Sequence, residues 1–280
     1  MTRTVRRNHR NHRTLHAAGA GVAALLALSA CSSSGGSAAA EPDSPASAGG
    51  SDPGKVTGDV TVFAAASLKE SFEKLGREFE RQHPGTKVTF SFGGSDSLAA
   101  SITGGAPADV FASASPRTMK IVTDAGDASG TPATFVRNRL QIATLPGNPD
   151  KIGSLKDLTD PNLKVVLCDK TVPCGAAAQK ALDASKLELT PVSYEEDVKS
   201  ALTKVVLKEA DAAVVYRTDV KAAGEKVEGV EFPEAAGAVN DYPVTVLEDA
   251  SNPVAAKAFI ELVQSPEGQR VLTEAGFLQP

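Results

Sequence analysis

Four short stretches of the sequence place hydroxyl groups or small residues where a predicted strand meets a predicted helix. Ser67 follows the apolar run 60–66, and Ser95 follows Gly93-Gly94 at the end of a second run. Cys174 opens an alanine-rich run, and Tyr216 closes the run 212–215. Hydroxyls and the free backbone N–H groups of a helix N-terminus are neutral hydrogen-bond donors that favour negative charge. The pattern therefore predicts the binding of a small anion by donors that carry no formal charge.

Three of the four junctions also have a structural interpretation. Ser67 could cap its helix, with Glu70 completing a capping box, instead of turning its hydroxyl outward. Gly93-Gly94 could be a plain connection, and Tyr216 could be an aromatic residue that packs at the rim of a sheet. Four junctions with matching chemistry favour the anion site over four unrelated coincidences.

Composition limits the other functions that the chain could have. The 280 residues contain no Trp, and aromatic residues make up 5%, so stacking platforms for sugars or bases are not expected. Residues 1–30 hold five of the 29 basic residues and no acid, which leaves 24 basic against 34 acidic residues in the rest of the chain. Such a negative surface disfavours nucleic acid as a partner.

Nucleophilic and metal chemistry are also disfavoured. Only one of the four histidines, His83, lies beyond residue 30, and the sequence has no Gly-x-Ser-x-Gly elbow. A serine hydrolase using Ser67 or Ser95 would therefore depend on His83 as its base. A metal site lacks the histidine and cysteine ligands that it would need.

The N-terminal segment has the features of an export signal. A basic stretch precedes the small-residue apolar run 17–30, which is too short to span a bilayer. Leu28-Ser29-Ala30-Cys31 resembles the lipobox of bacterial lipoproteins, which implies cleavage after residue 30 and a lipid anchor on Cys31. The alternative is an ordinary secretory peptide with an incidental cysteine. Residues 31–58, rich in Ser, Gly, Ala and Pro, are predicted to be a flexible tether.

The two remaining cysteines, Cys168 and Cys174, lie close together in the sequence of an exported chain. In an oxidising compartment such a pair is expected to form a disulfide.

Strand-like and helix-like runs alternate along the rest of the chain. Strands are predicted at 60–66, 88–92, 110–112, 139–145, 164–167, 212–216 and 242–247. Helices are predicted at 68–82, from 98, from 116, and at 174–184, 195–209, 253–264 and 266–275. This alternation predicts an α/β fold with mainly parallel sheets, in which ligands bind beyond the carboxyl ends of the strands.

Several motifs together resemble the molybdate-binding proteins of ABC importers, in order and in spacing, from residue 60 to the C-terminus. They are Val62-Phe63-Ala64-Ala65-Ala66-Ser67-Leu68, Phe92-Gly93-Gly94-Ser95, Gly105-Ala106-Pro107-Ala108-Asp109-Val110-Phe111, Glu195-Glu196-Asp197-Val198, Val214-Val215-Tyr216 and Tyr242-Pro243-Val244. The resemblance implies a two-lobed type II periplasmic-binding-protein fold with a hinge of two crossover strands. The first lobe would comprise 59–138 and 243–280, and the second 139–242.

The resemblance also implies a ligand and partners. Ser67 and Ser95 would supply hydroxyls and N–H groups, Cys174 and Val198 would act through backbone N–H, and Tyr216 would donate its phenol. The ligand would be molybdate or tungstate, with molybdenum bound only as the oxyanion and with no direct protein ligand or cofactor. The expected partners are a membrane permease and, through the anchor, the membrane itself; we expect a monomer. Asp96 and Asp169, beside the site loops, are expected to face solvent.

Other functions remain open at this point. The site could take another tetrahedral oxyanion such as sulfate or phosphate, and a tethered domain could also be a redox or adhesion lipoprotein.

Overall fold

The computed structural model describes residues 56–280. The predicted signal peptide, Cys31 and nearly all of the predicted tether lie outside the described residues. No helix in the described range is both long and apolar enough to cross a membrane. The described residues 56–280 belong to one compact unit by their internal contacts.

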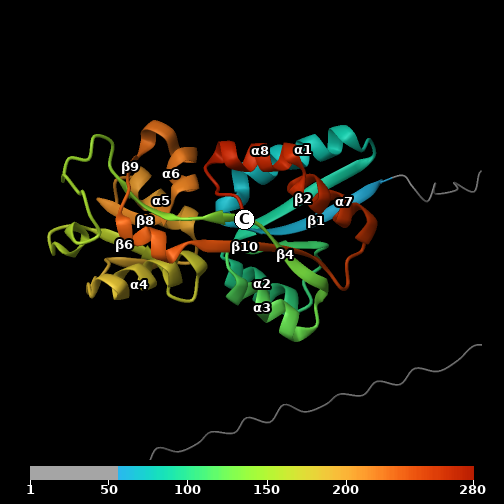
Figure 1. The fold of residues 1–280 in the computed structure, drawn as a ribbon, viewed down its shortest axis with the longest axis horizontal. Coiled ribbons are helices and arrows are strands. Elements are labelled where there is room, and N and C mark those ends of the chain that lie inside the picture. Colours follow the sequence, from blue (N-terminus) through green and yellow to red (C-terminus); the bar gives the residue numbers. More distant parts are fainter. Residues whose placement is uncertain (1–55) are drawn as a thin grey trace, which may run out of the picture. The chain divides into compact units, whose positions relative to one another are not determined.

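Two five-stranded sheets organise this part of the chain, one in each of two lobes (Figure 1). The first sheet, in spatial order, consists of β2 (Thr86–Gly93), β1 (Gly58–Ala65), β3 (Val110–Ala112), β10 (Asn240–Leu247) and β4 (Ala128–Asn138). The second consists of β7 (Ser193–Glu195), β6 (Val165–Cys168), β8 (Ala212–Tyr216), β5 (Leu140–Thr144) and β9 (Glu228–Val230).

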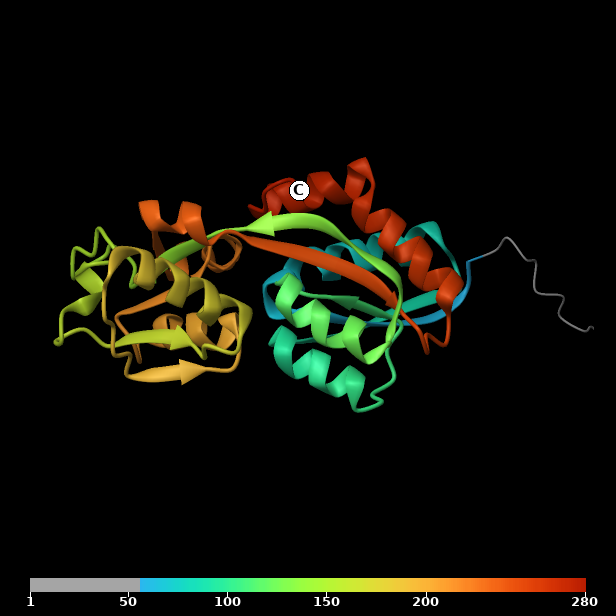
Figure 2. The ribbon, with the colours of Figure 1, turned by 60° about the horizontal axis from the view of Figure 1, so that its bottom comes forward.

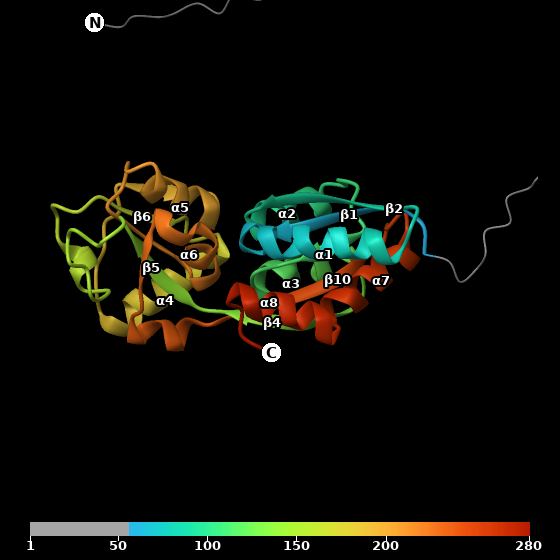
Figure 3. The same cartoon turned by 90° about the horizontal axis from the view of Figure 1, so that it is seen from above.

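Helices cover both faces of the first sheet. On one face lie α1 (Lys69–Gln82), α7 (Pro253–Gln264) and α8 (Pro266–Ala275), side by side in Figure 3, and on the other lie α2 (Ser95–Thr103) and α3 (Pro116–Ala125). The apolar residues at helical spacing explain this packing: Leu68, Phe72, Leu75 and Phe79 are all fully buried. The predicted bounds of α7 and α8 are confirmed, because Asn252 and Ser265 cap helices that begin with proline.

The second sheet has α4 (Pro173–Ser185) on one face and α5 (Val198–Val206) with α6 (Arg217–Ala223) on the other (Figure 1). Short 3₁₀ turns fill the connections: η1 (Ala66–Leu68) in the first lobe, and η2 (Asp157–Thr159), η3 (Gly224–Lys226) and η4 (Pro233–Ala238) in the second. The first lobe has two hydrophobic clusters, one on each face of its sheet, and the second lobe has one, which Ala66 of the first lobe joins.

The chain passes between the sheets twice, at adjacent places (Figure 2). β4 ends at Asn138 and continues through Arg139 into β5, and the return runs from η4 through Val239 into β10. At this point the two crossings pair with each other, since Asn240 lies opposite Asn138. The predicted two-lobed fold with two crossover strands is confirmed, and the lobe boundaries stay a prediction.

The expectation of mainly parallel sheets was wrong, and the sequence missed some of the elements. The sheets are mixed and not mainly parallel: four strand pairings are parallel, and the four made by β10 and β5 are antiparallel. The reason is that strands which cross the hinge run against the strands of the sheet they join. The strand β4 had not been predicted, and residues 195–197 precede the helix α5 that was expected to include them.

Candidate functional site

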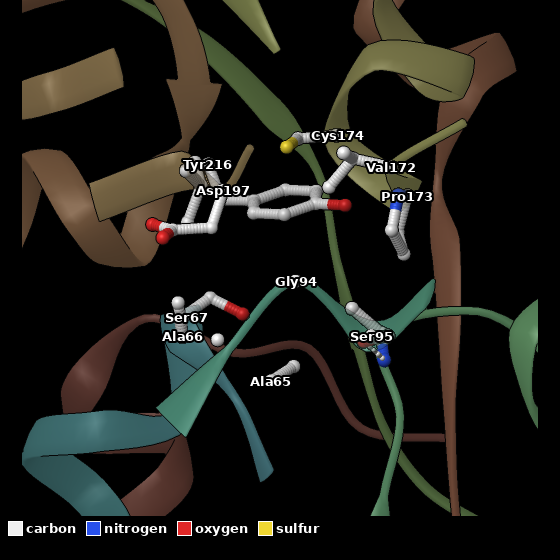
Figure 4. A pocket seen from close by; sticks show the side chains of 13 residues that line it. Ala65, Ala66, Ser67, Gly94, Ser95, Val172, Pro173, Cys174, Asp197 and Tyr216 are labelled. Atoms are coloured by element: carbon white, nitrogen blue, oxygen red, sulfur yellow. Dashed lines mark hydrogen bonds between the residues drawn. The ribbon is translucent and has the colours of Figure 1, made fainter. Parts of the chain in front are cut away.

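One of the pockets with residues from both lobes is lined by all five residues predicted to bind the anion. Figure 4 shows Ser67 and Ser95 on one side of it and Cys174 and Tyr216 on the other. The residues that line it are Ala65, Ala66, Ser67, Gly93, Gly94, Ser95, Ala114, Val172, Pro173, Cys174, Asp197, Val198 and Tyr216. This set contains no lysine or arginine, so a ligand would meet mainly neutral groups.

The first lobe contributes two junctions at the same edge of its sheet. β1 and β2 are parallel neighbours, and Ala65 lies opposite Gly93, so both strands end beside the pocket. Ser67 and Ser95 follow immediately and are almost fully buried. The Ser95 hydroxyl accepts a hydrogen bond from the Ala114 N–H at 3.0 Å, which leaves its own proton free to donate.

The capping interpretation of Ser67 was wrong. The Ser67 side chain makes no cap, and its Oγ lies 2.8 Å from the hydroxyl of Tyr242 instead. Tyr242 is fully buried in β10, 175 positions further along the chain. Its role beside Ser67 was missed because a partner so distant in sequence leaves no local pattern.

The second lobe contributes three junctions. Cys174 is in the first turn of α4, directly after Pro173, and its predicted disulfide with Cys168 at the end of β6 is confirmed. Val198 begins α5 behind the N-cap Asp197. Tyr216 ends β8, and its hydroxyl accepts a hydrogen bond from the Asn240 side chain at 2.8 Å.

The helices that begin at the pocket differ in their capping. There α2 and α4 begin without a side-chain cap, whereas the Asp197 side chain caps α5; elsewhere Ser115, Asn252 and Ser265 cap α3, α7 and α8. A helix end without a side-chain cap has N–H groups that a bound anion can satisfy. The two uncapped ends therefore suit an anion.

Asp197 is the one acidic residue in the lining, and the sequence analysis named it only as part of a motif and not as a residue of the site. Its Oδ1 accepts from the backbone N–H groups of Lys199 and Ser200, and its Oδ2 from the Ser200 hydroxyl. The carboxylate is thus engaged with the N-terminus of its own helix, which offsets its repulsion of an anion.

Gly94 lets the two lobes approach each other closely at this site. A Cβ on Gly94 would lie 2.5 Å from the Glu196 carbonyl oxygen of the other lobe. A side chain here would hold the lobes apart, so the requirement for glycine follows from lobe closure.

Burial determines the protonation of the groups around the pocket. Burial raises the pKa of Tyr216 and of Tyr242, so both phenols are neutral donors at physiological pH. Burial also raises the pKa of Asp219 to about 6, although Lys199 beside it acts in the opposite direction. Lys199 itself is held charged, because Asp219 and Glu70 outweigh the burial that would lower its pKa.

The expectations for the two neighbouring aspartates had different outcomes. Asp169 is exposed and accepts from the N–H and hydroxyl of Thr171, as predicted. The prediction for Asp96 was wrong, because it is half-buried and its Oδ1 is enclosed against Gly94. Within residues 56–280, no group of three or more His, Cys, Asp or Glu residues could hold a metal ion.

Comparisons with known proteins agree with this geometry. A family model described as bacterial extracellular solute-binding protein matches residues 60–278. The molybdate-binding protein ModA of Mycobacterium tuberculosis (strain ATCC 25618 / H37Rv) is 45% identical over 221 residues, which cover 79% of this chain and 85% of that protein. ModA of Escherichia coli (strain K12) is 32% identical over 235 residues, which cover 79% of this chain and 89% of that protein.

A solved structure shows the same fold. The periplasmic molybdate-binding protein of Azotobacter vinelandii superposes with a TM-score of 0.69 at 22% identity, over 79% of this chain and 99% of that one. At this identity the comparison concerns the fold alone.

Proposed function

The chain belongs to the bacterial extracellular solute-binding proteins, and within them to the ModA family, and from this we propose that it captures molybdate and delivers it to an ABC importer. The single observation that carries the proposal is the pocket lining, in which hydroxyls and helix N-termini converge without a lysine or arginine. Tungstate, which has nearly the same size and charge, should bind as well.

The chemistry of the ligand fits a site made of donors. Molybdate and tungstate carry no proton at neutral pH, so every oxygen can only accept hydrogen bonds. Hydrogen phosphate carries a proton and also requires an acceptor. In the proposal, Ser67 and Ser95 donate through hydroxyl and N–H groups, Cys174 and Val198 through N–H, and Tyr216 through its phenol. Each charge-assisted bond would contribute about 1.5–3 kcal/mol.

The proposed location is the outer face of the cell membrane. Cys31, which follows a lipobox-like sequence, would carry the lipid, and residues 31–58 would be the tether. The domain would then work as a monomer beside its permease. Cys31→Ser should leave the domain folded and move it from the detergent phase to the aqueous phase. Aqueous partitioning of the unchanged protein would rule out the anchor.

Ligand-dependent melting tests the proposed function. At a concentration 100 times its dissociation constant, molybdate should stabilise the fold by about 2.7 kcal/mol, which raises the melting temperature by roughly 5–10 °C. Sulfate at equal concentration should raise it less. A shift with phosphate as large as that with molybdate would favour the alternative ligand, a protonated oxyanion.

A further inference from the structure

Two asparagines lie where the crossover strands meet. Asn138 ends β4 and Asn240 begins β10, and they are opposite each other in the register of the two strands. Asn138 is fully buried, and Asn240 is partly buried. Neither lines the pocket, yet each contacts a tyrosine that belongs to the site or supports it.

The orientation of both side-chain amides is fixed by their other partners. Asn138 Oδ1 accepts the Arg139 N–H at 3.0 Å, so its Nδ2 is the atom that faces Thr218 Oγ1 at 2.9 Å and the Tyr242 hydroxyl at 3.4 Å. Asn240 Nδ2 lies 2.8 Å from the Ala114 carbonyl oxygen, and a carbonyl can only accept. Each amide therefore donates to its tyrosine.

The direction of these bonds decides where the hydroxyl protons point. Tyr216 accepts from Asn240, so its own proton points away from that amide and is available to the pocket that Tyr216 lines. Tyr242 accepts from Asn138 and can give its proton to Ser67 Oγ, at 2.8 Å. Ser67 then accepts from the protein and has its proton free for the pocket.

The three hydroxyls that line the pocket, those of Ser67, Ser95 and Tyr216, thus each accept a hydrogen bond from another group of the protein. Ser95 accepts from a backbone N–H, and Ser67 and Tyr216 accept from chains of donors that start at the two asparagines. Because burial raises the pKa of both tyrosines, the phenol protons that this direction needs are present at neutral pH.

We propose that Asn138 and Asn240 are positioning residues that turn the protons of Ser67 and Tyr216 into the pocket, which makes the site selective for oxyanions without a proton. This inference rests on the proposed function. It assigns the selectivity to two hinge residues that do not touch the ligand. A hydroxyl held in the donor direction cannot accept the proton of hydrogen phosphate, so the bonds that favour molybdate disfavour phosphate.

The test reverses one bond. In Asn240→Asp the side chain loses the bonds that Nδ2 gives to the Ala114 and Pro173 carbonyl oxygens, and its carboxylate accepts the Tyr216 proton instead, so the phenol oxygen presents a lone pair to the pocket. Titration calorimetry at pH 7.5 with molybdate, and with inorganic phosphate in competition, measures the ratio of the two dissociation constants. We expect the preference for molybdate over phosphate to fall about tenfold or more. The added charge repels both dianions, so it largely cancels in the ratio.

A double-mutant cycle separates positioning from a general structural effect. The loss of molybdate affinity caused by Asn240→Asp should be at least several-fold smaller in a Tyr216→Phe background, where no phenol proton remains to be turned. Asn138→Asp should show the same coupling with Ser67→Ala. Equal losses in both backgrounds, together with an unchanged ligand ratio, would overturn the proposal.

Two further results keep the test decisive. Because Asn138 is fully buried, Asn138→Asp could unfold the protein, and Tyr242→Phe then removes the donor to Ser67 without altering the hinge. That variant should lower the preference for molybdate, and an unchanged preference would overturn the role of Asn138. Wild-type protein that binds no oxyanion would refute the proposed function itself, before any variant is compared.

Discussion

Lys199 Nζ of α5 lies 2.8 Å from Glu70 Oε1 of α1, so an ion pair connects the two lobes beside the pocket. The same ammonium group lies 3.0 Å from Oδ1 of the fully buried Asp219. On another side of the cleft, the Arg117 guanidinium of α3 donates to the Thr171 carbonyl of the second lobe. The Lys199–Glu70 and Arg117–Thr171 contacts join the two lobes and exist only when the lobes are close together, so they stabilise the closed state, whereas Asp219 holds Lys199 within the second lobe.

Glu70→Gln should weaken molybdate binding slightly by removing the charge that attracts Lys199 across the cleft. The Glu70 side chain is half exposed, so the expected effect is below about 1 kcal/mol, a few-fold in affinity, and smaller at high salt. Glu78→Gln is the matched control, because Glu78 pairs with Arg81 within α1. Equal affinities of the Glu70 and Glu78 variants at low salt would contradict a role in closure.

Asp219→Asn should change how stability depends on pH. Burial raises the pKa of Asp219 from 3.8 to about 6, so the folded protein binds this proton more tightly than the unfolded chain does. The bound proton on Asp219 therefore stabilises the folded protein fully below about pH 4, and this stabilisation is lost as the pH rises through 6. Between pH 4 and pH 7, the free energy of unfolding of the variant should rise by up to about 3 kcal/mol relative to that of wild type.

Urea unfolding at several pH values measures this difference. Asp124, an exposed residue that forms an ion pair with Lys120, provides the control variant Asp124→Asn, which should show no such trend. A flat difference for Asp219→Asn, or one with the opposite slope, would show that Lys199 and not burial controls this carboxyl.

Ser67→Ala and Tyr216→Phe should each remove one charge-assisted donor from the ligand. The expected loss is about 1.5–3 kcal/mol, or roughly 10- to 100-fold in affinity, with the fold retained. Ser97→Ala and Tyr194→Phe alter exposed residues of the same types and should leave binding unchanged. Unchanged affinity in the pocket variants would remove these hydroxyls from the site.

Loss of the disulfide should affect binding more than stability. The bridge between Cys168 and Cys174 closes a short loop, for which chain entropy gives only about 2 kcal/mol. It also fixes the first turn of α4, so the Cys174 N–H is in place before an anion arrives. The double change Cys168→Ser and Cys174→Ser should weaken molybdate binding several-fold in calorimetry while far-UV circular dichroism stays the same. Unchanged affinity would refute this preorganisation.

The parts of the fold and site that could be predicted from sequence are those with a local signal. Ser67, Ser95, Cys174 and Tyr216 each stand at a change from strand pattern to helix pattern, and ends of this kind gather at one edge of a sheet. Val198 came only from the family resemblance, since Asp197 before it looks like an ordinary helix cap.

The parts that could not be predicted depend on distant partners or on weak strands. Tyr242 acts beside Ser67 from 175 positions away, and Asn138 and Asn240 matter through a pairing that only the hinge creates. The strand β4 contains Gly130 and Pro132, which argue against a strand in sequence. Its place at the edge of the sheet explains why they are tolerated.

Titration calorimetry of the mature domain with molybdate, tungstate, sulfate and phosphate tests the central claim most directly. We expect one site per chain, with molybdate and tungstate binding at least about tenfold more tightly than sulfate or phosphate, a difference of about 1.4 kcal/mol or more. Phosphate or sulfate binding as tightly as molybdate would contradict the account, as would the absence of heat with all four anions.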